Sequence, residues 1–155
     1  MAIEYTFIIK NEGAIPGYVR KIADYLPKEL KFNSELNRDW YLGKDGVVYN
    51  NSLAKSIINP GETKEITLIL TKNMNREDFG IISNSAEIFE TSNDYGMLDV
   101  DSVAGNKVTN EDDYSTANVL TSVKTGEAVV YTTLILSIIG IIGVGTYMIK
   151  KKVLK

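Results

Sequence analysis

The 155-residue sequence contains no cysteine and no histidine, and it has only three prolines and one tryptophan. The first two absences exclude disulfide bonds, thiolate zinc sites and imidazole metal ligands. They also exclude the usual catalytic triads. Two carboxylates alone would need a cleft and a raised pKa to hydrolyse a glycoside, and the sequence indicates neither. We therefore predict that the protein is not an enzyme and that it has no catalytic residues.

Basic charge is also scarce over most of the chain. Up to Gly126 there are 13 basic and 19 acidic residues, whereas the remainder has one acid and four lysines. Surfaces that bind nucleic acid need clustered Lys and Arg, because they must neutralise phosphates. The acidic body therefore argues against nucleic acid as a partner. The length of the chain suits one domain with a core, followed by a tail.

The tail is a long apolar run. Residues 128–149 are 22 residues without a charge. As a helix they would span about 33 Å, enough to cross a hydrocarbon core of about 30 Å. Tyr131 and Tyr147 lie near the two boundaries, where amphipathic rings are favoured. We predict a transmembrane helix over 128–149, held in a lipid bilayer, rather than a buried core helix.

The charges that flank this run predict its orientation. A basic tail follows at 150–155, and a short linker over 124–127 precedes the run. Basic residues favour the cytoplasmic side, so we expect a single-pass protein of the cell membrane with its N-terminal domain outside the cell. A tail-anchored protein with a cytosolic domain is the alternative, but it would oppose this charge bias. The opening "MAIEYTFIIK" lacks the features of a signal peptide, so the chain is expected to be the C-terminal piece of a longer exported protein.

The body has the alternation of β-strands. In "IEYTFIIK", Tyr5, Phe7 and Ile9 alternate with residues of the other face, and "TKEITLILT" alternates in the same way. "WYLGKDGVVY" predicts a hairpin, and "NPGE" at 59–62 predicts a tight turn. The sequence therefore predicts an all-β sandwich over 1–123. Its expected core includes Tyr5, Phe7, Ile9, Ile66, Leu68, Leu70 and Ile88.

The stretch "YTFIIKNEGAIPGYVRKIADYLPKELKF" resembles the opening of the repeat domain known as domain of unknown function eleven. In that family a strand leads to "KN-x-G", a turn with Pro, a second strand and "D-x-LP-x-x-L-x-F". The matching residues are Asn11, Gly13, Asp24, Leu26, Pro27, Leu30 and Phe32. The resemblance covers about 3–123 and implies an immunoglobulin-like β-sandwich, which occurs in tandem on large bacterial surface proteins. The chain begins almost on the family's "YT" strand, so one preceding strand is expected to be missing.

The resemblance implies a stalk or adhesion module. Together with the predicted membrane span, we expect a non-catalytic structural or stalk module that is anchored to the bacterial membrane and displays a larger exported protein. The alternative is an adhesin-type domain that binds an extracellular glycan or protein through "WYLGKDGVVYNN". The exposure of Trp40, Tyr41 and Tyr49 distinguishes the two functions, because burial of these rings would favour the stalk. For Trp40 itself a core or hairpin-packing role is expected, and stacking on a sugar is the alternative.

A long acidic loop is predicted over 90–115. Between Glu87 and Asp113 there are eight acids and one Lys. Ca²⁺ takes six to eight oxygen ligands, which such a segment supplies. Ala104 and Asn110 occupy the positions where an EF-hand counted from Asp99 needs Gly and Glu, so that motif is excluded. The expected Ca²⁺ ligands are Asp94, Asp99, Asp101, Asp112 and Asp113, and a solvated loop without a cation is the alternative.

The linker resembles a sortase sorting signal of the LPXTG type, which would attach the chain to the cell wall. Lys124, Thr125 and Gly126 match the motif, whereas Ser122 and Val123 replace its Leu and Pro. Proline matters because it fixes a bend in the peptide, which Val does not impose. We therefore predict that the chain stays uncleaved, with wall attachment as the alternative.

Overall fold

The computed structural model describes residues 1–72, 80–98, 102–121 and 131–140, the last of these as backbone. These ranges contain no helix and form two β-sheets, which confirms the predicted all-β architecture. The strands are β1 (Ala2–Asn11), β2 (Tyr18–Tyr25), β3 (Lys31–Phe32), β4 (Trp40–Leu42), β5 (Val48–Asn50), β6 (Thr63–Thr71), β7 (Gly80–Ser92), β8 (Tyr114–Thr121) and β9 (Tyr131–Gly140).

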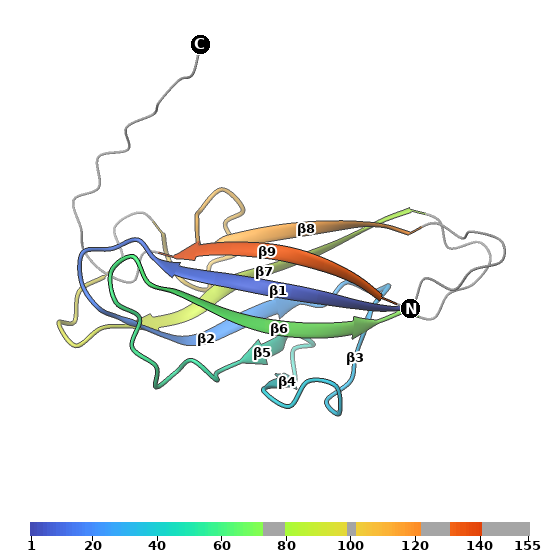
Figure 1. Cartoon of the computed structure of the whole chain (residues 1–155), viewed down its shortest axis with the longest axis horizontal. Helices are drawn as coiled ribbons and strands as arrows, with labels where there is room; N and C mark the ends of the chain where they lie inside the picture. Colours follow the sequence, from blue (N-terminus) through green and yellow to red (C-terminus); the bar gives the residue numbers. More distant parts are fainter. Residues whose placement is uncertain (73–79, 99–101, 122–130, 141–155) are drawn as a thin grey trace, which may run out of the picture.

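The two sheets lie face to face (Figure 1). One has the strand order β3-β6-β1-β9 and the other β4-β5-β2-β7-β8. Strand β1 pairs antiparallel with β6 on one side and parallel with β9 on the other. Strand β7, the longest among the described residues, lies between β2 and β8 and pairs antiparallel with both.

Both sheets contribute to one core. Along β1 every second side chain is buried, and Ile3, Tyr5, Phe7 and Ile9 have no exposed surface. Residues from β2 and from β4 to β8, with Leu30 and Ile58 between strands, complete the same cluster. Burying one such aliphatic or aromatic side chain stabilises the fold by about 1.5–3 kcal/mol. The predicted core is confirmed, with Ile66 partly buried against it.

The "KN-x-G" segment forms a turn that is held by the side chain of Asn11. Its Oδ1 accepts a hydrogen bond from the Gly13 amide at 2.9 Å, and its Nδ2 donates to the Ile15 and Ile58 carbonyls at 2.9 and 2.8 Å. Asn11 is fully buried, so these bonds satisfy polar atoms that water cannot reach. The motif that carried the family resemblance therefore has a structural role in this chain.

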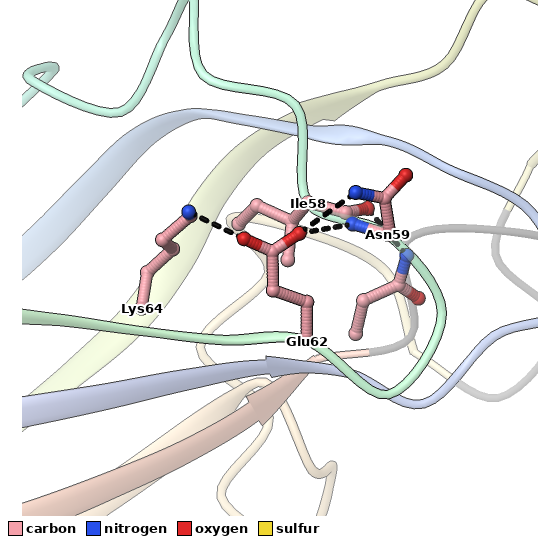
Figure 2. Close-up of polar contacts among 5 residues, drawn as sticks. Ile58, Asn59, Glu62 and Lys64 are labelled. Atoms are coloured by element: carbon pink, nitrogen blue, oxygen red, sulfur yellow. Dashed lines mark hydrogen bonds and ion pairs between the residues drawn. The ribbon is translucent and has the colours of Figure 1, made fainter.

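The "NPGE" segment is a tight turn, as predicted. The Glu62 amide donates to the Asn59 carbonyl at 2.9 Å, and Gly61 has a φ of 77°, which glycine adopts without strain. The Glu62 carboxylate accepts from the Asn59 amide and Nδ2, both at 2.9 Å, and pairs with Lys64 (Figure 2). The Asn59 backbone bond, followed by the Lys64 and Asn59 side chains, lowers the pKa of Glu62 to about 2.

The apolar run differs from the sequence prediction where the structure describes it. A membrane helix was expected over 128–149, but Tyr131–Gly140 is strand β9, and the rest of the run lies outside the described residues. The edge of β1 offers this segment backbone partners from Ala2 to Asn11. Its Ile and Thr residues also suit a strand. In the described part of the chain, no helix is long and apolar enough to cross a membrane.

Candidate interaction surface

Trp40 belongs to the core. It is 4% exposed, its ring centroid lies 5.1 Å from that of Phe7, and its Nε1 donates to the Thr67 carbonyl at 2.6 Å. This bond ties β4 of one sheet to β6 of the other. Trp40 is therefore not part of an exposed aromatic surface, as the core interpretation predicted.

An aromatic cluster nevertheless lies on the outer face of the five-stranded sheet. Tyr41 on β4 is 43% exposed, and its ring centroid is 5.7 Å from that of Tyr49 on β5. The Tyr49 ring in turn makes an edge contact with Phe89 on β7, at 5.4 Å between centroids. The Lys21 Nζ lies 5.6 Å from the Tyr49 centroid and pairs with Glu90. We call these five residues the aromatic face.

The β4–β5 hairpin positions Tyr49 within this face. The hairpin closes with Gly46 at a φ of 82°, and the Gly43 amide donates to the Val47 carbonyl at 2.8 Å. A side chain at position 43 would come within 2.7 Å of the Tyr49 ring, so glycine leaves room for it. The Tyr49 hydroxyl donates to Asp45 at 2.7 Å. This bond raises the pKa of Tyr49 to about 12 and lowers that of Asp45.

An open pocket of about 630 Å³ lies beside this hairpin, between the ends of β3 and β4. Its lining includes Lys31, Phe32, Trp40, Tyr41 and Leu42. Leu42 is 52% exposed, so apolar surface is available there. The pocket and the aromatic face share Tyr41, and both include residues of the segment "WYLGKDGVVYNN".

The acidic loop is ordered by its own side chains where the structure describes it. Asn93 organises a turn, because its Oδ1 accepts from the Tyr95 and Met97 amides, both at 3.1 Å. Farther along, Glu111 accepts from the Val103 amide at 2.9 Å and from the Asn106 Nδ2 at 2.9 and 3.0 Å. These contacts hold the returning segment as a defined loop.

The predicted Ca²⁺ ligands are placed in part. Asp94 is exposed in the Asn93 turn, and Asp113, which is 2% exposed, directly precedes β8. Asp112 lies one residue before it. Asp99 and Asp101 lie outside the described residues. Among the residues with described side chains, no three acids are grouped closely enough to hold a metal ion. The Ca²⁺ site stays a prediction.

The same loop buries a carboxylate that the sequence analysis missed. Glu87 on β7 has no exposed surface, and it accepts hydrogen bonds from the Tyr25 hydroxyl and, at 2.9 Å, from the Lys107 amide. Lys107 also lies over the Tyr25 ring, 4.3 Å from its centroid. At Gly105 a side chain would come within 2.9 Å of the Phe89 carbonyl, which keeps the loop close to the sheet. Burial raises the pKa of Glu87.

A second buried polar group lies between the sheets. The Asn84 Nδ2 on β7 donates to Asp24 on β2 at 2.6 Å, and neither residue is exposed. The Asp24 Oδ1, the Asn84 Oδ1 and the Tyr5 hydroxyl have no hydrogen-bond partner among the described residues. Burial raises the pKa of Asp24 to about 7, and burial followed by the charge of Asp24 raises the pKa of Tyr5. We call Asp24, Asn84 and Tyr5 the polar trio. Ionisation of Asp24 lowers the stability of the fold, because it places a charge among buried groups.

The sorting-like residues Lys124, Thr125 and Gly126 lie outside the described residues. Comparisons of the chain with protein-family models, curated proteins and solved structures found no match. The interpretation of the surface therefore depends on its own residues.

Proposed function

We propose that this chain is a non-catalytic structural module of a bacterial cell surface, in which an immunoglobulin-like sandwich is carried on a C-terminal membrane anchor. The strand order supports the fold assignment. Strands β6-β1 facing β2-β7-β8 correspond to the E-B and C-F-G strands of immunoglobulin-like domains, whereas β3 lies beside β6 but comes before β4 and β5 in the chain. This order also agrees with the resemblance to domain of unknown function eleven.

The observation that carries the stalk function is the place of Trp40. Its ring is buried between the two sheets and its Nε1 bonds to the other sheet, so it cannot stack on a sugar. This favours a structural module over a sugar-binding one. The uncharged run 128–149 and the lysines after it supply the anchor in this proposal.

Membrane fractionation of bacteria that express the full chain tests the anchor. We expect the protein in the membrane pellet, resistant to high salt and alkaline washing and released by detergent. A variant with Leu136→Lys and Ile141→Lys should move to the soluble fraction, because each charge costs about 2.5–3.5 kcal/mol near the centre of a membrane helix. Thr116→Lys, on exposed sheet surface, is the matched control and should remain in the pellet. Recovery of the unmodified chain in the soluble fraction would refute the anchor.

A second candidate function is the adhesin-type domain. Exposed Tyr41 and Leu42 beside an open pocket favour it, because a surface aromatic ring can stack on a sugar or pack on a peptide. Binding of the chain to a panel of glycans and host-surface proteins, compared between the unmodified chain and Tyr41→Ala, tests this function. Loss of binding in Tyr41→Ala but not in exposed Tyr95→Ala would support it. Absence of binding to the whole panel would favour the stalk.

A further inference from the structure

Strand β1 has two edges, and the outer one is paired by β9. The register runs without a break from Ala2 opposite Tyr131 to Asn11 opposite Gly140. β6 pairs with the inner edge from Ala2 to Lys10. The outer edge of β1 can therefore pair with another strand along its whole length.

In immunoglobulin-like sandwiches the place beside the second strand belongs to the first strand of the domain. Here β1 corresponds to the second strand, and β9 occupies that place in parallel orientation. If the place were empty, the unpaired backbone groups of β1 would form an open sheet edge, which is a site of aggregation. The occupant therefore protects both the edge and the core beneath it.

The occupant comes from the uncharged run 128–149. Residues 131–140 cannot lie against β1 and cross a bilayer at the same time, because in lipid a lone segment must satisfy its backbone groups as a helix. The two locations are therefore mutually exclusive, and a bilayer competes with β1 for the same residues.

We propose that the outer edge of β1 is a strand-acceptor site for residues 131–140, which occupy it while the chain is outside a bilayer and leave it on membrane insertion. The inference rests on the membrane anchor proposed above. In the unanchored chain the docked segment pairs with the backbone of β1 and closes the edge of the sheet. After insertion the edge of β1 is free for another extended segment.

Because the chain has no cysteine, one engineered pair reports the docked state. Thr6 on β1 is opposite Ile135 on β9, and neighbours in register are close enough for a disulfide after small adjustments. The full chain with Thr6→Cys and Ile135→Cys is synthesised in a cell-free system, without lipid or with phosphatidylglycerol–phosphatidylcholine vesicles, and is then oxidised. Trypsin digestion and mass spectrometry measure the disulfide between peptides 1–10 and 125–150.

The matched control is Thr6→Cys with Thr67→Cys, which reports the β1–β6 pairing. We expect the Thr6–Ile135 disulfide without lipid and its loss with vesicles, whereas the Thr6–Thr67 disulfide should form under both conditions. Mixing isotope-labelled and unlabelled chains distinguishes the source of the strand. Disulfides between labelled and unlabelled peptides would mean that a second copy donates it, and this result would overturn the proposal.

Flotation of the vesicles separates this inference from the proposed anchor. Equal disulfide yields with and without lipid, in a chain that does not float, would make β9 a permanent strand and would reject both. A chain that floats but forms no Thr6–Ile135 disulfide without lipid would reject the acceptor site and leave the anchor intact. A chain that floats with the disulfide still formed would also reject the proposal, because docking and insertion would then coexist.

Discussion

The buried carboxyl of Asp24 should make the domain less stable as the pH rises. Its pKa is about 7 in the folded protein, against an ordinary value of 3.8, because burial opposes its ionisation and the Asn84 bond offsets this only in part. The folded state therefore holds a proton that the unfolded state releases. Stability from this group is complete below about pH 4 and is lost as the pH rises toward 7. The difference corresponds to about 4 kcal/mol between pH 4 and pH 8.

Urea unfolding of the full chain, followed by the fluorescence of the single tryptophan, measures this effect. Trp40 is buried in the core, so its emission should shift when the sheets separate. Between pH 4 and pH 8, we expect Asp24→Asn to lose about 4 kcal/mol less unfolding free energy than the unmodified chain. Asparagine keeps an oxygen to accept the Asn84 bond but has no proton to lose.

Exposed Asp39→Asn is the matched control and should keep the pH dependence of the unmodified chain. Glu87 also has a pKa raised by burial, so Asp24→Asn should leave part of the slope. The same slope in Asp24→Asn and in the unmodified chain would refute the reasoning. It would mean that Asp24 is ionised in the folded protein and that the polar trio has a partner for the charge.

Three further predictions follow from the core, the turn and the loop. Leu68→Asp should unfold the body, seen as loss of cooperative urea unfolding, because it places a charge in a position with no exposed surface; a folded variant would contradict the core. Glu62 has a lowered pKa, so the stability it provides is present above pH 4.5 and is lost as the pH falls toward 2. The urea midpoint of Glu62→Gln should therefore fall less in acid than that of the unmodified chain. An equal fall in both proteins would contradict the turn geometry. Ca²⁺ at a hundred times its dissociation constant should add about 2.7 kcal/mol to the unfolding free energy, and Asp99→Ala with Asp101→Ala should abolish the gain; equal melting curves in millimolar Ca²⁺ and in chelator would reject the site.

Much of the fold was predictable because its strands are half-buried. In β1 and β6 the apolar residues alternate, so the period of two was visible along "IEYTFIIK" and "TKEITLILT". The two turns were predictable for a different reason. Gly46 and Gly61 mark positions where the backbone needs a positive φ, and both adopt it.

The apolar run could not be assigned in the same way. An uncharged, mostly apolar run has no clear period, so it fits a membrane helix and a fully buried strand equally well by pattern. Its length and the lysines after it favoured a helix, whereas the strand at 131–140 depends on the edge of β1, which is far away in the sequence. A pattern read along one segment does not show that a distant strand can pair with it.

The candidate surface was predicted least well. Tyr41 and Tyr49 were in the predicted binding segment, but Lys21 and Phe89 join them from β2 and β7, and only the sheet order brings these strands together. Glu87 was counted only as one of the acids next to the predicted loop, and its burial was not predicted. It is buried because the loop folds back over β7, which no local pattern indicates.

Single-cysteine labelling tests the central claim most directly, because the chain has no other cysteine. Full-length Thr116→Cys and Lys155→Cys are expressed in bacteria and treated with a maleimide that does not cross membranes. The account predicts that Thr116→Cys, on exposed surface of the sandwich, is labelled in intact cells, and that Lys155→Cys is labelled only after the membrane is permeabilised. Labelling of Lys155→Cys but not of Thr116→Cys in intact cells would reverse the orientation and contradict a surface module.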